Sequence, residues 1–102
     1  MIELTSLFEF EKLSLESNLV MIDFYAEWCG PCKRIKQFYE NLSNMYPQIK
    51  FAKVDVDEAE DIATRFNVSS LPTFILLRGG KELRRVEGAS EPGLLNAIKS
   101  VI

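Results

Sequence analysis

Residues 19–25 form a run of apolar residues that only Asp23 interrupts. A strand that is apolar at successive positions is typical of a parallel sheet covered on both faces, so we predict a central strand over Leu19–Tyr25. From Cys32 to Tyr46, apolar residues recur at steps of three and four, which indicates a helix that Pro47 ends. A buried strand followed closely by an amphipathic helix favours an α/β architecture.

The N-terminal segment indicates another helix. Ser6 and Glu9 have the spacing of a capping box, and Thr5 is an alternative cap. The side chains that we expect this helix to bury are Leu7, Phe8, Leu13 and Leu15. We expect the apolar face of the helix that follows the central strand to comprise Ile35, Phe38, Tyr39, Leu42, Met45 and Tyr46.

The second half of the chain continues the alternation of strands and helices. Ile49–Val56 alternates between two sets of side chains, as a strand does, and Asp57 with Glu60 is expected to open a short helix. Glycines between two further strands, over 73–77 and 82–87, predict a hairpin. Ser90, followed by Pro92, is expected to cap a last helix that runs to about residue 101. The order predicts a mixed sheet with helices on both sides.

Length and charge narrow the function. The chain has 102 residues, which predicts a single domain over 1–102. A net charge of -3 leaves no basic surface for nucleic acid or for acidic membranes. The N-terminal stretch lacks the basic and apolar segments of a signal peptide, so we expect a cytoplasmic protein, in a compartment where lasting disulfides are rare. Two cysteines in that setting indicate redox or metal chemistry.

The most informative motif is Trp28-Cys29-Gly30-Pro31-Cys32, at the junction of strand and helix. Residues three apart in a first helical turn have Cα atoms about 5 Å apart, which is within the range of a disulfide. The helix N-terminus is expected to favour a thiolate on Cys29, helped by the cations that follow. Cys32, one turn in, is expected to be less exposed and to act second, as the resolving thiol.

A zinc site is the main structural alternative for such a cysteine pair. Zinc usually takes four ligands, often from a second cysteine pair or from histidines. This chain has two cysteines and no histidine, so an intramolecular zinc site would need carboxylates or a second chain. We therefore favour redox use and expect neither a metal nor a cofactor.

Three segments together resemble the thioredoxin family: 23–33 with the cysteine motif, 51–57, and Leu71-Pro72-Thr73-Phe74. The resemblance covers essentially the whole chain. It implies a thioredoxin fold, with a central five-stranded mixed sheet and four helices. It also implies a protein-disulfide reductase that acts by dithiol–disulfide exchange on disulfide-containing proteins and is re-reduced by a thioredoxin reductase. From the net charge, we expect no nucleic acid or membrane partner. We expect it to be a monomer.

The resemblance also assigns site residues. Cys29 is the implied attacking thiol, Cys32 the resolving thiol, Asp23 the carboxylate beneath them and Lys53 the lysine near that carboxylate. Pro72 is implied to follow a cis peptide bond. The residues implied to bind substrate are Trp28, Gly30, Pro31, Leu71, Pro72, Gly88 and Ala89. Asp57 resembles the acid that bonds the Trp28 indole.

Several of these assignments have simpler alternatives. If Asp23 is buried inside its apolar strand, its carboxyl should have a raised pKa. The alternative is that Asp23 lies at the end of the strand, where its side chain reaches water. Lys53 fits a solvated strand lysine equally well. Asp57 fits a helix cap, which is compatible with its bond to Trp28, and Gly88 fits the exit of a hairpin. At the level of function, the alternatives are a disulfide oxidase or isomerase, or a binding module built on the same fold.

One departure from the family concerns the active-site helix. The family's usual proline, five residues after the second cysteine, is replaced by Gln37. Proline in a helix interior removes a hydrogen bond and kinks the helix. We therefore expect a straighter helix after Cys32, with an effect on redox tuning rather than on the type of reaction.

Overall fold

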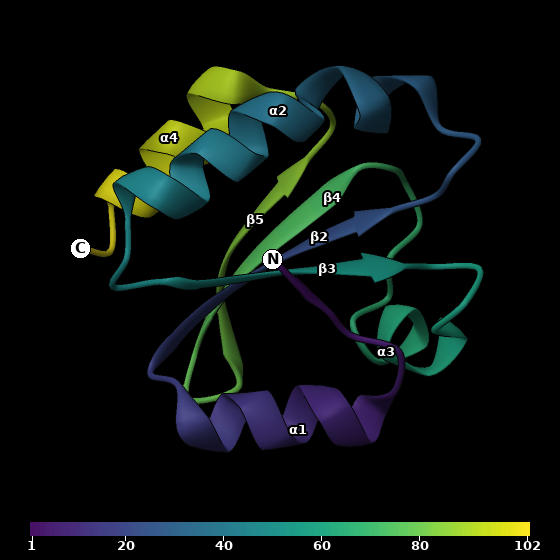
Figure 1. Cartoon of the computed structure of the whole chain (residues 1–102), viewed down its shortest axis with the longest axis horizontal. Coiled ribbons are helices and arrows are strands. Elements are labelled where there is room, and N and C mark those ends of the chain that lie inside the picture. Colours follow the sequence, from purple (N-terminus) through teal and green to yellow (C-terminus); the bar gives the residue numbers. More distant parts are fainter.

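The computed structural model describes residues 1–102, and its centre is a five-stranded sheet (Figure 1). The strands are β1 (Ile2–Glu3), β2 (Leu19–Tyr25), β3 (Lys50–Asp55), β4 (Thr73–Arg78) and β5 (Lys81–Glu87). Their spatial order is β1-β3-β2-β4-β5. β1 and β2 run parallel to β3, whereas β4 is antiparallel to both β2 and β5. The predicted mixed sheet, with residues 19–25 as its central strand, is confirmed.

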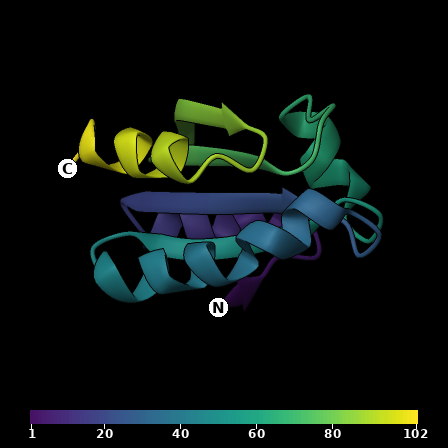
Figure 2. The ribbon, with the colours of Figure 1, turned by 90° about the horizontal axis from the view of Figure 1, so that it is seen from above.

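Four helices cover the sheet: α1 (Leu7–Glu16), α2 (Gly30–Met45), α3 (Glu60–Arg65) and α4 (Glu91–Lys99). α1 and α3 lie on one face, and α2 and α4 lie on the other (Figure 1). When the molecule is seen from above, α2 and α4 lie on either side of β2 (Figure 2). None of these helices combines the length and the apolar character that crossing a membrane requires. The expected count of five strands and four helices is confirmed.

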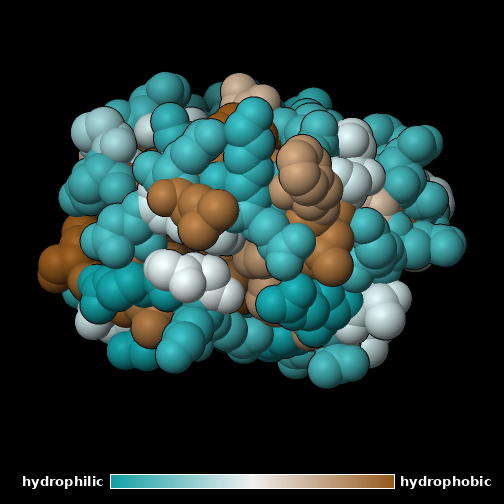
Figure 3. All heavy atoms as spheres, turned by 90° about the horizontal axis from the view of Figure 1, so that it is seen from below, coloured by the Kyte–Doolittle hydropathy of each residue, from teal (hydrophilic) through white to brown (hydrophobic).

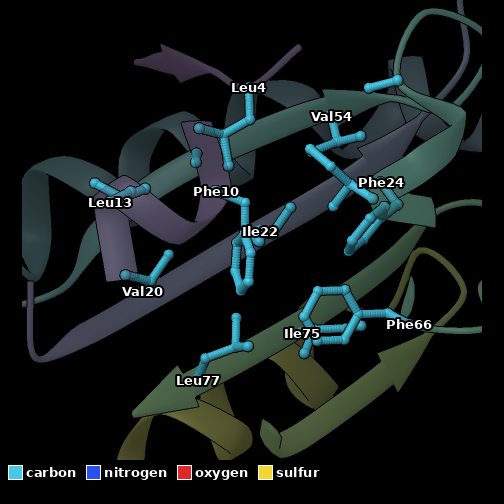
Figure 4. Packing of buried hydrophobic residues seen from close by; sticks show 13 residues of the cluster. Leu4, Phe10, Leu13, Val20, Ile22, Phe24, Val54, Phe66, Ile75 and Leu77 are labelled. Atoms are coloured by element: carbon cyan, nitrogen blue, oxygen red, sulfur yellow. The ribbon is translucent and has the colours of Figure 1, made fainter. Parts of the chain in front are cut away.

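The central strand contributes to both halves of the core. Val20, Ile22 and Phe24 belong to the cluster between the sheet and α1 (Figure 4), whereas Met21 belongs to the cluster under α2 and α4. Successive side chains of a strand point to opposite faces, so Asp23 falls on the α2 side. The same alternation that fills the core therefore directs this carboxylate towards the helix that carries the cysteines.

The serine caps predicted for α1 and α4 and the predicted hairpin are confirmed. The Oγ of Ser6 accepts a hydrogen bond from the backbone N–H of Glu9 at 3.2 Å, and Ser90 caps α4 in the same way. Gly79 and Gly80 join β4 to β5 with φ angles of 58° and 80°. Two successive residues in this left-handed region suit glycine and match the twist of a two-residue hairpin.

The buried face of α1 was predicted wrongly in part. Phe8 and Leu15 have exposed fractions of 74% and 90%, whereas Phe10 is 2% exposed and Leu13 is buried. Phe10 and Leu13 are three residues apart and share the stripe that faces the sheet, while Phe8 and Leu15, seven apart, share a stripe that faces solvent. On the face seen in Figure 3, exposed apolar side chains form small, separate patches among hydrophilic ones.

Two expectations at helix ends are also wrong. Met45, expected to be buried, is 62% exposed because it flanks the stripe of α2 that packs on the sheet. Asp57 does not cap α3: the cap is Ala59, which makes no side-chain bond. Instead, the Oδ1 of the buried Asp55 accepts a hydrogen bond from the N–H of Asp57 at 3.0 Å, and so orders the turn after β3.

The packing of α1 predicts a contrast between two phenylalanines. The ring of Phe10 meets that of Phe66 edge to face, with centroids 5.2 Å apart (Figure 4). Phe10→Ala should lower the free energy of unfolding by about 3 to 4 kcal/mol, because it leaves a cavity in the core. Phe8→Ala, the matched control on the same helix, should change it by under about 0.5 kcal/mol. Urea denaturation measures both, and equal losses would contradict the assignment of the buried face.

Candidate active site

The two cysteines lie where the chain passes from β2 into α2. Cys29 is the N-cap of α2, and its disulfide to Cys32 spans the first turn with 5.3 Å between the Cα atoms. Pro31 lies in the same turn, where a backbone N–H would have no helical partner. The predicted spacing of the pair is confirmed.

The sulfur of Cys29 lies at the N-terminus of α2 and accepts a backbone hydrogen bond there. Its Sγ accepts a hydrogen bond from the backbone N–H of Cys32 at 3.2 Å. The free amides of a helix N-terminus and the positive end of the helix dipole both favour negative charge at this position. Lys33 and Arg34 follow on the exposed side of α2. The site therefore provides a favourable environment for a thiolate on Cys29.

Burial does not separate the two cysteines as we expected. Cys29 is 4% exposed and Cys32 is 5% exposed, so Cys32 is not the less accessible of the two. The disulfide brings both sulfurs together in the first turn, which evens out their exposure. What distinguishes them is the space that each lines: Cys29 lines an open groove, and Cys32 lines a separate cavity that also contains Asp23.

The groove at Cys29 collects most of the expected substrate-binding residues. Trp28, Gly30, Pro31 and Leu71 line it, together with Val56 and Val68, which the sequence analysis did not identify. A Cβ added to Gly30 would meet only the Nη1 of Arg34, at 3.8 Å, which is an ordinary contact. The fold itself therefore does not require glycine at this position.

Trp28 is held at the rim of this groove. Its side chain is among the exposed large apolar groups, at 71%, yet its indole Nε1 donates a hydrogen bond to Asp57 Oδ2 at 2.9 Å. The expected bond between these residues is confirmed. One end of the ring is anchored, and most of its surface stays accessible to another molecule.

Pro72, Gly88 and Ala89 lie beside the groove rather than in its wall. The Leu71–Pro72 peptide bond is cis, as the family resemblance implied. The N–H of Gly88 donates to the carbonyl of Pro72 at 2.8 Å, and Gly88 has a φ of 96°, which suits glycine at the exit of β5. Ala89 is exposed, and neither Gly88 nor Ala89 lines the groove.

Asp23 lies in the cavity behind the disulfide. It is 6% exposed, and its Oδ1 has no hydrogen-bond partner. The cavity has a volume of about 270 Å³, and its wall includes Cys32 and Lys53. Burial raises the pKa of Asp23 from 3.8 to about 7, against an opposing effect of Lys53 and with a smaller contribution from Glu3 in the same direction as burial. The expectation of a buried carboxyl with a raised pKa is confirmed.

Lys53 lines this cavity but pairs elsewhere. Its Nζ lies 3.7 Å from the Oε1 of Glu3, and its side chain is 31% exposed. The hydroxyl of Tyr25 donates to the same carboxylate, at 3.0 Å from Oε2. Lys53 is thus both near Asp23, as the resemblance implied, and partly solvated. Glu3 was missed by the sequence analysis.

Tyr39 closes the cavity from α2. Its hydroxyl is within hydrogen-bond distance of two backbone carbonyls, that of Ala52 at 2.8 Å and that of Met21 at 3.1 Å. Burial raises the pKa of Tyr39 well above its usual range, so this hydroxyl stays protonated. Tyr39 therefore does not exchange a proton near neutral pH, whereas the pKa of Asp23, at about 7, suits such an exchange. No group of three or more His, Cys, Asp or Glu side chains is arranged to hold a metal.

Comparison with known proteins gives consistent matches. Residues 2–100 match the family model described as Thioredoxin. Thioredoxin-1 of Saccharomyces cerevisiae is 46% identical over 90 residues, covering 88% of this chain and 87% of that protein. A solved thioredoxin of Plasmodium falciparum superposes with a TM-score of 0.95 at 39% identity, covering all of both chains. Oxidised mitochondrial thioredoxin 3 of S. cerevisiae gives 0.95 at 40%, covering 99% of this chain and 95% of that one.

The raised pKa of Asp23 predicts a pH-dependent cost to stability. Below the unfolded-state pKa of 3.8 both states are protonated, and the cost is absent; it grows as the pH rises and is complete above about 7, where the folded state has also ionised. Three pKa units correspond to about 4 kcal/mol as an upper limit. Asp23→Asn should therefore differ little from the wild type at pH 4, where this cost has only begun to grow, and should exceed its free energy of unfolding at pH 7.5.

Urea denaturation of the oxidised proteins at pH 4, 5.5 and 7.5 checks this expectation. Glu58→Gln is a control, because it removes an exposed carboxylate from outside the cavity. A stability difference between Asp23→Asn and wild type that stays constant with pH would contradict a buried, titrating Asp23.

Proposed function

The chain belongs to the thioredoxin family, and on that basis we propose that Cys29 is its attacking thiol and Cys32 its resolving thiol. The protein is a thiol–disulfide oxidoreductase, which reduces protein disulfides by dithiol–disulfide exchange through its Cys-Gly-Pro-Cys site. The observation that carries the assignment of roles is that Cys29 lines the open groove, whereas Cys32 lines the cavity of Asp23.

The reaction proceeds in two exchanges. The thiolate of Cys29 attacks one sulfur of a substrate disulfide, forms a mixed disulfide and expels the other substrate sulfur as a thiolate. Cys32 then loses its proton and attacks the Sγ of Cys29, which releases the second substrate thiolate and leaves the Cys29–Cys32 disulfide. Two electrons pass from the protein to the substrate, and the substrate thiolates take up protons.

We assign the proton of Cys32 to Asp23. Both residues line one cavity, and burial raises the pKa of Asp23 to about 7, so the carboxylate is available near neutral pH and basic enough to accept a proton. Transfer is either direct or through one water. Lys53, in the wall of the same cavity, opposes the rise in the pKa of Asp23 and so modulates the base.

The substrate chain is proposed to dock along the groove. Trp28, Pro31 and Leu71 offer apolar surface there, and the side-chain-free Gly30 leaves room for a close backbone approach. The backbone of Leu71, ahead of Pro72, is proposed to pair with the substrate. Gly88 and Ala89, next to Pro72, are proposed to border the docked chain.

Disulfide-containing proteins are the substrates, and a reductase returns the dithiol. We propose that this partner is a thioredoxin reductase and that the protein acts as a single-domain monomer in the cytoplasm. The two cysteines are both in the redox pair, which fits a compartment that keeps other thiols reduced. A relative named as mitochondrial makes mitochondria the competing location, and imaging of a fluorescent fusion in intact cells distinguishes the two.

The order of the cysteines predicts a difference between two serine variants. Cys29→Ser should abolish reduction of insulin, because no attack occurs. Cys32→Ser should attack once and accumulate a mixed disulfide, because the second exchange is lost. Non-reducing electrophoresis and mass spectrometry of trapped adducts measure this difference. Equal trapping by both variants would contradict the roles assigned to Cys29 and Cys32.

The role of Asp23 predicts slower turnover without loss of the fold. Asp23→Asn keeps the shape of the side chain but removes the base, so reduction of insulin at pH 7 should slow by about a hundredfold or more. A stopped-flow measurement with an aromatic disulfide, which releases one coloured thiolate in each exchange, should place the loss in the second release. Unchanged kinetics of that release would exclude Asp23 as the base.

A further inference from the structure

Three charged residues lie in one row across the sheet. Glu3 of β1 is the register partner of Lys53 of β3, and Lys53 is also the register partner of Asp23 of β2. Residues at the same level of adjacent parallel strands point to the same face. A lysine therefore lies between two carboxyl groups, one at the edge of the sheet and one in its interior.

The lysine is paired with the outer carboxylate. The Nζ of Lys53 is 3.7 Å from Glu3 Oε1, while Oδ1 of Asp23 has no hydrogen-bond partner. Tyr25 reinforces this arrangement: its hydroxyl donates to both carboxylate oxygens of Glu3, and the Lys53 Nζ lies 5.7 Å from the centroid of its ring. The contacts made by Tyr25 hold the Glu3 carboxylate and the Lys53 ammonium at the outer end of the row.

Other titratable groups line the same cavity, and each is a candidate for shifting the pKa of Asp23. Those that line it besides Asp23 and Lys53 are the amino-terminal Met1, Tyr25 of β2, Glu27 of the following loop, and Lys33, Lys36, Tyr39 and Glu40 of α2. Cys32 does not titrate while it is in the disulfide. The charges that shift the pKa of Asp23 are that of Lys53 in the cavity wall, which favours the ionised form, and that of Glu3 outside the cavity, which opposes ionisation.

We propose that Glu3 is a positioning residue for the proton-accepting carboxyl of Asp23, because it draws the Lys53 ammonium to the edge of the sheet and keeps it from a close ion pair with Asp23. The inference rests on the proposed role of Asp23 as the base. A close pair with Lys53 would stabilise the carboxylate and make it a weaker base for the proton of Cys32. A carboxylate on the edge strand thus affects proton transfer without touching the reacting sulfurs.

Glu3→Gln tests the proposal on the oxidised protein, in which neither cysteine titrates. The carboxyl carbon signal of Asp23, followed by NMR from pH 4 to 9, gives its pKa directly. We expect the variant to lower that pKa by about half a pH unit or more, from Coulomb's law over two strand spacings of roughly 10 Å plus the inward movement of Lys53. Glu3→Asp, which keeps the charge, should restore most of the wild-type value.

Two controls separate positioning from simple charge. Glu11→Gln makes the same change in net charge on the exposed side of α1 and should leave the pKa of Asp23 in place. In a Lys53→Met background, Glu3→Gln should shift the pKa of Asp23 by less than half as much as it does in the wild type, because no ammonium remains to be positioned. An equal shift with and without Lys53, or no shift in Glu3→Gln, would overturn the proposal.

Kinetics connect the same variants to the reaction. With the aromatic disulfide, the rate of the second thiolate release should fall at low pH, where Asp23 is protonated. This acid limb of the pH profile should move to lower pH in Glu3→Gln by the same amount as the pKa of Asp23 measured by NMR. If the pKa moves while this limb stays in place, Glu3 controls Asp23 but Asp23 is not the base, which contradicts the proposed function alone. If Asp23→Asn slows the second release while Glu3→Gln moves neither quantity, the base is correct and the role of Glu3 is wrong.

Discussion

The burial of β2 on both faces is the constraint on which the site depends. Its alternate residues fill two separate clusters of different composition, so a slip of one residue would exchange the two sets between the faces of the sheet and turn Asp23 towards α1. This register fixes Asp23 on the side of α2. It also fixes the point at which the chain leaves the sheet, and therefore where Cys29 begins the helix. The placement of both chemical groups is a by-product of core packing.

The site also separates two electrostatic tasks. At the N-terminus of α2, backbone amides provide an environment that favours a negatively charged sulfur on Cys29. A short distance away, the interior disfavours the charge of Asp23 and keeps its proton affinity high. The surroundings of the Cys29 sulfur therefore favour negative charge because they are the end of a helix, whereas the nearby carboxyl of Asp23 keeps a high proton affinity because it lies in the middle of a sheet.

Much of this could be predicted from the sequence because the signals were local. The strand over 19–25, the serine caps and the two-glycine hairpin each depend on neighbouring residues. The errors came from choices that only tertiary contacts decide: α1 has two apolar stripes, and packing selects that of Phe10 over that of Phe8. Asp57 bonds an indole 29 residues away instead of capping its own helix. The role of Glu3 could not be predicted from the sequence, because a strand of two residues shows no periodicity. Its partners become neighbours only through the register of the sheet.

The position of β1 at the edge of the sheet has a practical consequence for work on this protein. Only two residues of β1 pair with β3, and Met1, just before them, lines the cavity of Asp23. Such short edge segments open more readily than central strands. An affinity tag or fusion partner joined to Met1 would thus perturb the surroundings of the active site, whereas one joined after Ile102 would emerge at the far end of the molecule from the start of α2 (Figure 1). Redox measurements on differently tagged preparations are therefore not interchangeable.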